Sequence, residues 1–331
     1  MIRIGLLVAA GIVLVIGLLL ATGISPAMAG SELIAGAFGS PRAISGSLRE
    51  TTPLLFAGLA VFLALRAGLF NIGAEGQLVV GAAATAAVAL KFPGPIGIVL
   101  GMVAGMVAGA LWAWPAGAIR AYRNGHEVIT TIMLNRVAVL ATDWLVGSQG
   151  PLRDPTTGGT TTAVLPRHSR LPDLLGPPLS VSSGLLLGLI LAGGLWWWLG
   201  RTVAGYELRA AGANPTAARF AGVEPQRVMV RAMLSSGALA GLGGAVQVLA
   251  FEGRFYQGFS PGYGFDALGV ALLAAGNALW TIPAALLFGA LSQGGTRLGI
   301  SGVPKEITGV ILGVVILIAG ALRYRRVRTV A

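Results

Sequence analysis

The sequence has no cysteine, two histidines and few charged residues. Without thiols the chain forms no disulfide and no cysteine-built zinc or iron–sulfur site, and thiol catalysis is excluded. Charged residues make up 11% of its 331 residues, whereas a soluble domain carries about a quarter. Hydrophobic residues make up 55% and the mean hydropathy is +0.81, so the composition indicates a membrane protein.

Motifs for catalysis are missing as well. The sequence contains no G-x-x-x-x-G-K-S/T phosphate loop, no H-E-x-x-H metal motif and no G-x-S-x-G nucleophile motif. We therefore expect neither enzyme activity nor a metal or other cofactor. The net charge of +11 comes mostly from arginines placed singly at the ends of apolar runs, without interleaved aromatic residues, so we expect no nucleic-acid partner.

Long apolar runs predict membrane spans, since an apolar helix of about 20 residues crosses the hydrocarbon core. The predicted spans are 4–24, 51–65, 76–90, 92–119, 128–146, 174–200, 232–251, 267–296 and 307–322. The stretch 267–296 is too long for one crossing, so we expect two short crossings with a break near 277–283. Residues 1–331 are therefore predicted to form one all-α polytopic membrane domain, a bundle of about 8–10 transmembrane helices with broken or re-entrant segments.

Basic residues in the loops predict the orientation. Thirteen fall on the side of both termini and eight on the other, and the side richer in basic residues is normally cytoplasmic. We expect a multi-pass protein of the cell membrane, inner or plasma, with both termini in the cytoplasm and its spans in contact with lipid. The first span is expected to stay in place; a cleaved signal peptide is the alternative, but the apolar run is longer than usual for one.

Small residues and prolines predict how the spans pack and where one loop lies. Glycines recur at every fourth position at Gly97, Gly101, Gly105 and Gly109, and again at Gly237 and Gly241. Such spacing puts them on one helix face, where another backbone can approach closely. Loop 147–182 carries six prolines and a threonine-rich tract, which favours an extended extracytoplasmic cover able to receive an external partner.

Polar residues interrupt the apolar pattern between the second and third spans. Residues 68–77 contain three glycines together with Asn71, Glu75 and Gln77. One interpretation is a broken helix at membrane depth, whose polar side chains line a path. The other is a turn at the cytoplasmic surface beside Arg66, with Glu75 at the N-terminus of the next helix. The segments 76–90 and 267–279 are both short and interrupted, which indicates an internal repeat.

A second polar set lies in the span 128–146 and its flanks. Glu127, Thr130, Thr131 and Asn135 share one helix face. They either line a path or form hydrogen bonds between helices. Arg136 and Asp143 share the opposite face, where we expect an ion pair. Asp266 is a further path candidate, or the N-cap of the next helix.

Loop 201–231 is predicted to be cytoplasmic and to fold into two short helices. The first covers 206–211 and is expected to stop at Gly212. The second covers 216–221, with Asn214 as N-cap, Pro215 at its first position and Gly222 at its end. This loop would present Glu207, Leu208, Arg209, Arg219 and Phe220 to a partner protein. The alternative is an amphipathic helix that rests on lipid headgroups.

Residues 207–222 (ELRAAGANPTAARFAG) resemble the coupling loop of ABC importer permeases of the branched-chain amino acid and monosaccharide superfamily. Four more segments are similar to the nucleoside and simple-sugar uptake branch: 70–77 (FNIGAEGQ), 127–135 (EVITTIMLN), 150–155 (GPLRDP) and 262–266 (GYGFD). They occur in the expected order over most of the chain. His126 and Arg136 depart from the pattern, where Asn and an aromatic residue are commoner.

The resemblance implies a permease subunit that pairs with a second related permease. It also implies cytoplasmic ATP-binding subunits, an external substrate-binding lipoprotein, and a nucleoside or simple sugar as substrate. The residues expected to line or shape the path are Asn71, Glu75, Gln77, Glu127, Thr131, Asn135 and Asp266. Those expected to couple to the ATPase are Glu207, Leu208, Arg209, Gly212, Asn214, Pro215, Arg219, Phe220 and Gly222.

Three alternatives remain from the sequence. The first keeps the ABC machine and changes the cargo to ribose-like sugars or branched-chain amino acids. The second is a secondary transporter in which Glu75, Glu127 or Asp266 carries the coupling proton. It leaves the structured loop 201–231 without a role. The third, a passive channel, is favoured least because no feature indicates a ring-forming oligomer.

Overall fold

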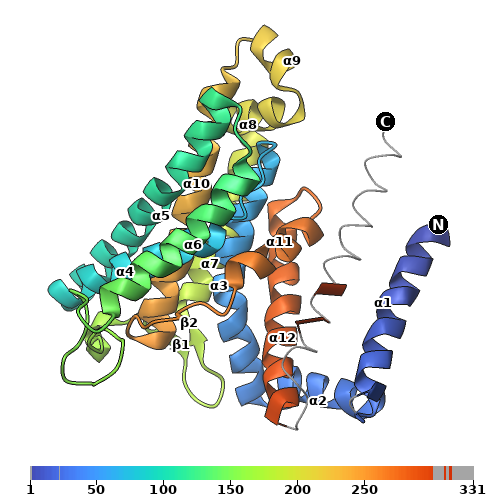
Figure 1. Ribbon diagram of the computed structural model, residues 1–331, viewed down its shortest axis with the longest axis vertical. Helices are drawn as coiled ribbons and strands as arrows, with labels where there is room; N and C mark the ends of the chain where they lie inside the picture. Colours follow the sequence, from blue (N-terminus) through green and yellow to red (C-terminus); the bar gives the residue numbers. More distant parts are fainter. Residues whose placement is uncertain (1, 22, 301–308, 311–312, 315–331) are drawn as a thin grey trace.

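Helices form most of the chain in the computed structural model, which describes residues 2–21, 23–300, 309–310 and 313–314 (Figure 1). The α-helices are α1 (Ile2–Ala21), α2 (Pro26–Phe38), α3 (Pro41–Arg66), α4 (Ala74–Lys91), α5 (Pro95–Arg123), α6 (Glu127–Val146), α7 (Ser183–Arg201), α8 (Val203–Ala213), α9 (Pro215–Phe220), α10 (Pro225–Val246), α11 (Tyr263–Leu273) and α12 (Thr281–Ile300). The short elements are η1 (Arg167–Ser169), η3 (Ala278–Trp280), the π-helix η2 (Gln247–Glu252) and the strands β1 (Asp173–Leu175) and β2 (Val181–Ser182). The all-α prediction is confirmed.

Five of the described helices are long and apolar enough to cross a membrane. They are α3, α5, α6, α7 and the continuous stretch Pro225–Glu252 made by α10 and η2. Residues Ala9–Ala21 and α2 together make a sixth candidate, bent by 102°. The predicted spans 76–90 and 267–296 are also helical, the first as α4 and the second as α11 followed by α12. The predicted span 307–322 lies outside the described residues except at 309–310 and 313–314.

Two predicted spans start at the wrong residue. Helix α3 begins at Pro41, ahead of the charge-free run, because Ser40 caps it by accepting from the Ala43 N–H at 3.1 Å and proline suits the first helical position. Arg49 within the helix pairs with Glu252 at 2.7 Å. The run that starts at residue 174 first forms a β-hairpin, and α7 begins at Ser183. Pro177 and Pro178 lie between the two strands, and their rings and missing N–H groups prevent a helix there.

The predicted break in the stretch 267–296 is confirmed. Helix α11 ends at Leu273, and Gly276 then takes a φ of +92°, a conformation that a glycine adopts without strain. The Asn277 side chain accepts a hydrogen bond from the Leu279 N–H at 3.0 Å, and α12 starts at Thr281. The chain therefore forms two helices separated by a turn, where one straight helix would be too long for the membrane.

Glycines bring α4, α5 and α10 together, as their spacing predicts. A Cβ on Gly109 would overlap the Gly237 carbonyl and the backbone of Gly241, and a Cβ on Gly81 would also overlap Gly241. A Cβ on Gly105 would lie 3.0 Å from the Ala245 side chain. Because the backbones touch without intervening side chains, α10 packs deep in the bundle against both helices.

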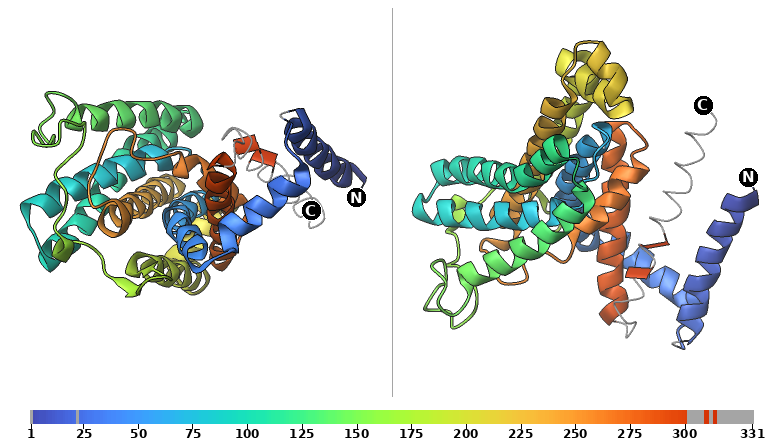
Figure 2. Two further views of the ribbon diagram at one scale, coloured as in Figure 1. Left: turned by 90° about the horizontal axis from the view of Figure 1, so that it is seen from below. Right: turned by 45° about the horizontal axis from the view of Figure 1, so that its top comes forward.

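Helices α3 and α10 form the interior, and α5, α6 and α7 surround them. In the apolar 18-residue stretch of each spanning helix, 78% is buried in α3 and 67% in Pro225–Glu252. The corresponding stretches are only 28% buried in α5 and α7 and 22% in α6, so these helices turn apolar side chains outward. Helices α8 and α9 project at one end of the molecule, and the β1–β2 hairpin lies at the opposite end (Figures 1 and 2).

Candidate functional site

Residues 67–73, which we call the re-entrant turn, join α3 to α4 inside the bundle. Gly68 has a φ of +73°, which lets the chain reverse where α3 ends. The Leu69 N–H then donates to the Ala64 carbonyl at 3.0 Å. Leu69 and Asn71 are fully buried. Irregular backbone of this kind is stable in a membrane protein where protein groups satisfy it or where it lines a cavity.

Three buried polar side chains hold the re-entrant turn: Asn71, Gln77 and Ser236. The Asn71 Nδ2 donates to Gln77 Oε1 at 2.8 Å and to Ser236 Oγ at 2.7 Å. The Gln77 Nε2 donates back to Asn71 Oδ1 at 3.0 Å, and the Ser236 hydroxyl donates to the Ala60 carbonyl at 2.6 Å. The cluster ties the turn to α3, α4 and α10. Sequence analysis missed Ser236, although it is a polar residue within a predicted span.

The polar face of α6 packs against the same turn. The Asn135 side chain accepts from the Gly76 N–H at 2.9 Å and donates to the Ile72 carbonyl at 2.8 Å. The Glu127 carboxylate accepts from the Phe70 N–H at 3.4 Å and pairs with Arg120 at 3.3 Å. Thr131 is buried on this face too, and its hydroxyl donates to a carbonyl of its own helix. Together with Asn71, Gln77 and Ser236, these side chains hold the re-entrant turn by hydrogen bonds between and within helices. We call this set of residues the clamp.

One prediction about charged residues is wrong, and one of two alternatives for another is excluded. In the described structure Asp143 does not pair with Arg136: its Oδ1 accepts from the Gly258 N–H at 3.2 Å, and Arg136 is exposed. Gly258 has a φ of +72° in the segment before α11, and this segment folds back over α6. Asp266 is not an N-cap, because α11 begins at Tyr263 and Asp266 lies within its first turn.

The N-termini of α4 and α11 meet in the interior, at a place we call the junction. The Gly264 N–H of α11 donates to Glu75 Oε2 of α4 at 2.7 Å. A Cβ on Gly264 would overlap the backbone of Glu75, so the two helices touch directly. Each N-terminus carries a partial positive charge that stabilises the Glu75 carboxylate. The two interrupted segments of the sequence therefore begin at one point.

Two more carboxylates reach the junction. Glu50 of α3 accepts from the Tyr263 hydroxyl at 3.1 Å and from the Ser292 hydroxyl at 3.2 Å. Asp266 lies in the first turn of α11, three residues after Tyr263. Sequence analysis missed Glu50 because the charge-free run began one residue later. The structure thus gathers acidic side chains from α3, α4 and α11 at the buried meeting point of two helices.

The predicted coupling loop folds into both expected helices, α8 and α9. Asn214 caps α9, since its Oδ1 accepts from the Thr216 and Ala217 N–H groups at 3.0 Å each. Pro215 is the first residue of α9, and Gly222 follows the helix with a φ of +84°. Arg219 is exposed and the Phe220 side chain is 91% exposed. Glu207 and Arg209 are half-buried.

Two details of this loop differ from the prediction. Helix α8 continues through Gly212 to Ala213, and Leu208 is buried at 4% exposure instead of being presented to a partner. Gly212 is needed for close packing, because a Cβ there would overlap the backbone of Arg66 and Ala67. In the same way, a Cβ added to Gly68 would lie 3.0 Å from the Gly212 carbonyl oxygen. The α8 helix therefore rests directly on the start of the re-entrant turn.

Loop 147–182 is fastened to the segment that follows α10. The Thr162 N–H donates to the Phe255 carbonyl at 2.9 Å and the Leu171 N–H to the Leu249 carbonyl at 2.9 Å. Within the loop, hydrogen bonds from the Thr156 hydroxyl and N–H hold the pKa of the exposed Asp154 below its ordinary value. The loop is a fixed cover over this end of the bundle.

Apolar helices with a few buried polar side chains between them, two helices that begin inside the bundle and a projecting helical loop are typical of a multi-pass membrane permease. The chain belongs to the branched-chain amino acid transport system permease component family, whose model matches residues 43–320. It is therefore a permease subunit of an ABC importer, which works with ATP-binding subunits and a substrate-binding protein and is not itself an enzyme.

Relatives in three organisms are similar over most of the chain. A guanosine ABC transporter permease of Bacillus subtilis is 35% identical over 87% of this chain and 83% of its own length. A glucose ABC transporter permease of Haloferax volcanii is 35% identical over 82% of this chain and 74% of its own. A nucleoside ABC transporter permease of Lactococcus lactis is 32% identical over 86% and 81%. No solved structure was found to match.

Proposed function

We propose that the cargo of this permease is a nucleoside. The observation that carries the proposal is the junction: Glu50 and Glu75 bond to the start of α11, and Asp266 lies in the first turn of that helix. Carboxylate oxygens accept hydrogen bonds from ribose hydroxyls and from the N–H groups of a base. They repel the carboxylate of a branched-chain amino acid, which needs a cation as its partner. Two of the three relatives above are named for nucleosides, which agrees with this choice.

The polar residues near the path divide into two roles. Glu50, Glu75 and Asp266 shape the passage and offer acceptors to the cargo. Asn71, Gln77 and Asn135 use their amides on one another and on backbone groups, and so hold the re-entrant turn in place. Glu127 and Thr131 support this clamp from α6. Clamp and passage adjoin, because Gln77 and Glu75 lie in the first turn of α4.

Movement reaches the passage through the coupling loop. ATP-binding subunits engage the exposed α9, with Phe220 and Arg219 at its end. Helix α8 passes the movement on at Gly212, which touches the end of α3 and the re-entrant turn. Both termini and this loop are cytoplasmic, a second related permease completes the path, and loop 147–182 faces the lipoprotein that delivers the cargo.

Uptake of labelled guanosine, glucose and leucine tests the cargo. Cells with and without the chain are compared, each with its partner subunits present. We expect guanosine uptake to disappear without the chain while leucine uptake is unchanged. Chain-dependent uptake of glucose or leucine, with none of guanosine, would show that the acidic junction serves a different cargo.

A further inference from the structure

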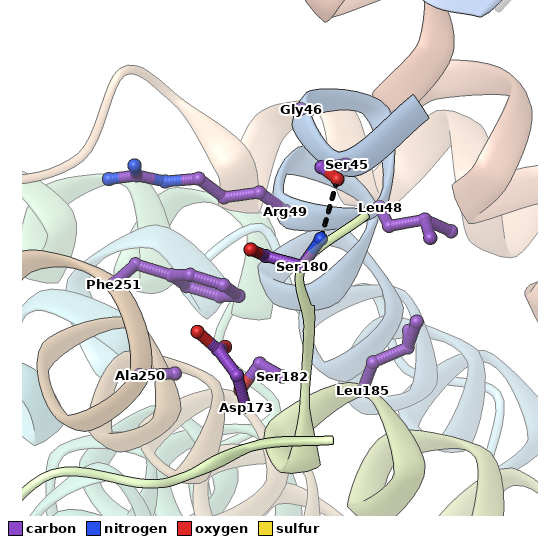
Figure 3. Close-up of a pocket in the computed structure, with 10 residues that line it drawn as sticks. All are labelled: Ser45, Gly46, Leu48, Arg49, Asp173, Ser180, Ser182, Leu185, Ala250 and Phe251. Carbon is purple, nitrogen blue, oxygen red and sulfur yellow. Dashed lines mark hydrogen bonds between the residues drawn. The ribbon is translucent and has the colours of Figure 1, made fainter. Parts of the chain in front are cut away.

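A cavity of about 310 Å³ lies where the β1–β2 hairpin meets α3 and η2, away from the junction (Figure 3). This volume is at the lower end of the range, about 300–1,000 Å³, that small-molecule pockets occupy. The polar and aromatic side chains that line it include Ser45, Arg49, Asp173, Ser180, Ser182 and Phe251. Part of its wall is the β1–β2 hairpin of loop 147–182, and this hairpin lies at the end of the bundle opposite α8 and α9 (Figure 1).

The walls of this cavity are fixed by hydrogen bonds. The Ser45 hydroxyl of α3 accepts from the Ser180 N–H at 2.9 Å, which fastens the hairpin to α3. Its own proton is shared between the Pro41 carbonyl at 3.0 Å and the Pro178 carbonyl at 3.3 Å. On the opposite wall, Arg49 pairs with Glu252 of η2 at 2.7 Å. The cavity is therefore a built part of the fold, with little freedom to collapse.

The wall formed by η2 is a π-helix, an element that is rare and often found at functional sites. Gln247, its first residue, is buried, and its Oε1 has no hydrogen-bond partner in the described structure. An unpaired buried acceptor costs stability, so the fold keeps this group at some expense. It places Phe251 with its ring toward the hairpin (Figure 3).

The exposed groups of the cavity match the two halves of a nucleoside. The Arg49 guanidinium lies 5.4 Å from the centre of the Phe251 ring, which orders this ring as a surface on which a flat base can stack. The Asp173 carboxylate points toward the same ring (Figure 3). No described protein group bonds to that carboxylate, so both of its oxygens are available to a pair of neighbouring hydroxyls.

We propose that this cavity is an outer subsite for a nucleoside, with the base on Phe251 and the ribose hydroxyls on Asp173, occupied before the cargo reaches the junction. The proposal rests on nucleoside transport as the function of the chain and adds the place where the cargo first binds. A hexose supplies the hydroxyls but no aromatic ring, so the subsite favours nucleosides over sugars.

Photolabelling of the complete purified transporter tests the subsite. The probe is radiolabelled 8-azidoadenosine, and labelled peptides are identified by mass spectrometry. We expect label on peptides from 173–182 or 247–252, displaced by guanosine and not by glucose. The variants Asp173→Asn and Phe251→Ala should each lose about tenfold in labelling, as expected for one charge-assisted hydrogen bond or one stacked base. In uptake, the KM for guanosine should rise with kcat unchanged.

Two matched variants are the controls. Asp154→Asn changes an exposed carboxylate of the same loop, and Phe92→Ala removes an aromatic ring that also lies beside a cation, at 5.9 Å from Lys91 Nζ. Both should label and transport like the wild type. Two outcomes would overturn the subsite while guanosine uptake still supports the proposed function. The first is equal labelling of the wild type and all variants, and the second is label found only on other peptides. A wild-type transporter that takes up no nucleoside overturns both.

Discussion

Replacing Asn71 with alanine removes a fully buried amide that makes three hydrogen bonds, two to Gln77 and one to Ser236. Each such bond within a membrane bundle contributes about 0.6 kcal/mol, and the partners left unpaired add a further penalty, so we expect Asn71→Ala to lower the free energy of unfolding by about 2–4 kcal/mol. Ser236→Ala should also destabilise, because its hydroxyl links Asn71 to the Ala60 carbonyl.

SDS-induced unfolding in mixed micelles, followed by tryptophan fluorescence, measures this loss. Because the two residues share one bond, the double variant should be less destabilised than the sum of the single variants by about 0.5–1.5 kcal/mol. Asn277→Ala is the control for the loss of a side-chain amide outside the clamp, because Asn277 caps η3. If Asn71→Ala keeps the wild-type stability and loses only uptake, then Asn71 contacts the cargo and the clamp interpretation is refuted.

Three further predictions concern packing and coupling. Gly212→Val should leave the subunits assembled and hydrolysing ATP but abolish uptake, because the side chain separates α8 from the re-entrant turn; Gly200→Val, which points into open space, should transport normally. Phe220→Ala should keep the protein in the membrane, since this ring is 91% exposed, but lower co-purification of the ATP-binding subunits by about tenfold. Gly109→Val should reduce the amount of folded protein in fluorescence size-exclusion chromatography, because its side chain enters the backbone of α10, whereas Gly193→Val has room.

Features that depend on the local sequence were predictable. Asn214 and Pro215 define the start of α9 through capping rules that act within one turn of helix. The break after α11 follows from the length of the apolar run, and the close approach of α5 to α10 follows from the glycine spacing. Each of these depends on neighbours along the chain or on one helix face.

Features that depend on how helices are placed relative to one another were not predictable. Asp143 bonds to Gly258, far along the chain, although Arg136 lies on its own helix face. Glu50 belongs to the junction because Tyr263 and Ser292 lie against α3. Gly212 resembles a helix end in the sequence, and its packing against Arg66 explains why a glycine stands inside α8.

The measurement that tests the central claim most directly is guanosine uptake under two kinds of energy depletion. Cells that carry the chain and its partner subunits are assayed after ATP depletion and, separately, after an uncoupler has dissipated the proton gradient with ATP maintained. An ABC importer predicts uptake that stops without ATP and continues with the uncoupler. Uptake that follows the proton gradient instead would contradict this account and would make Glu50, Glu75 and Asp266 the proton-carrying groups.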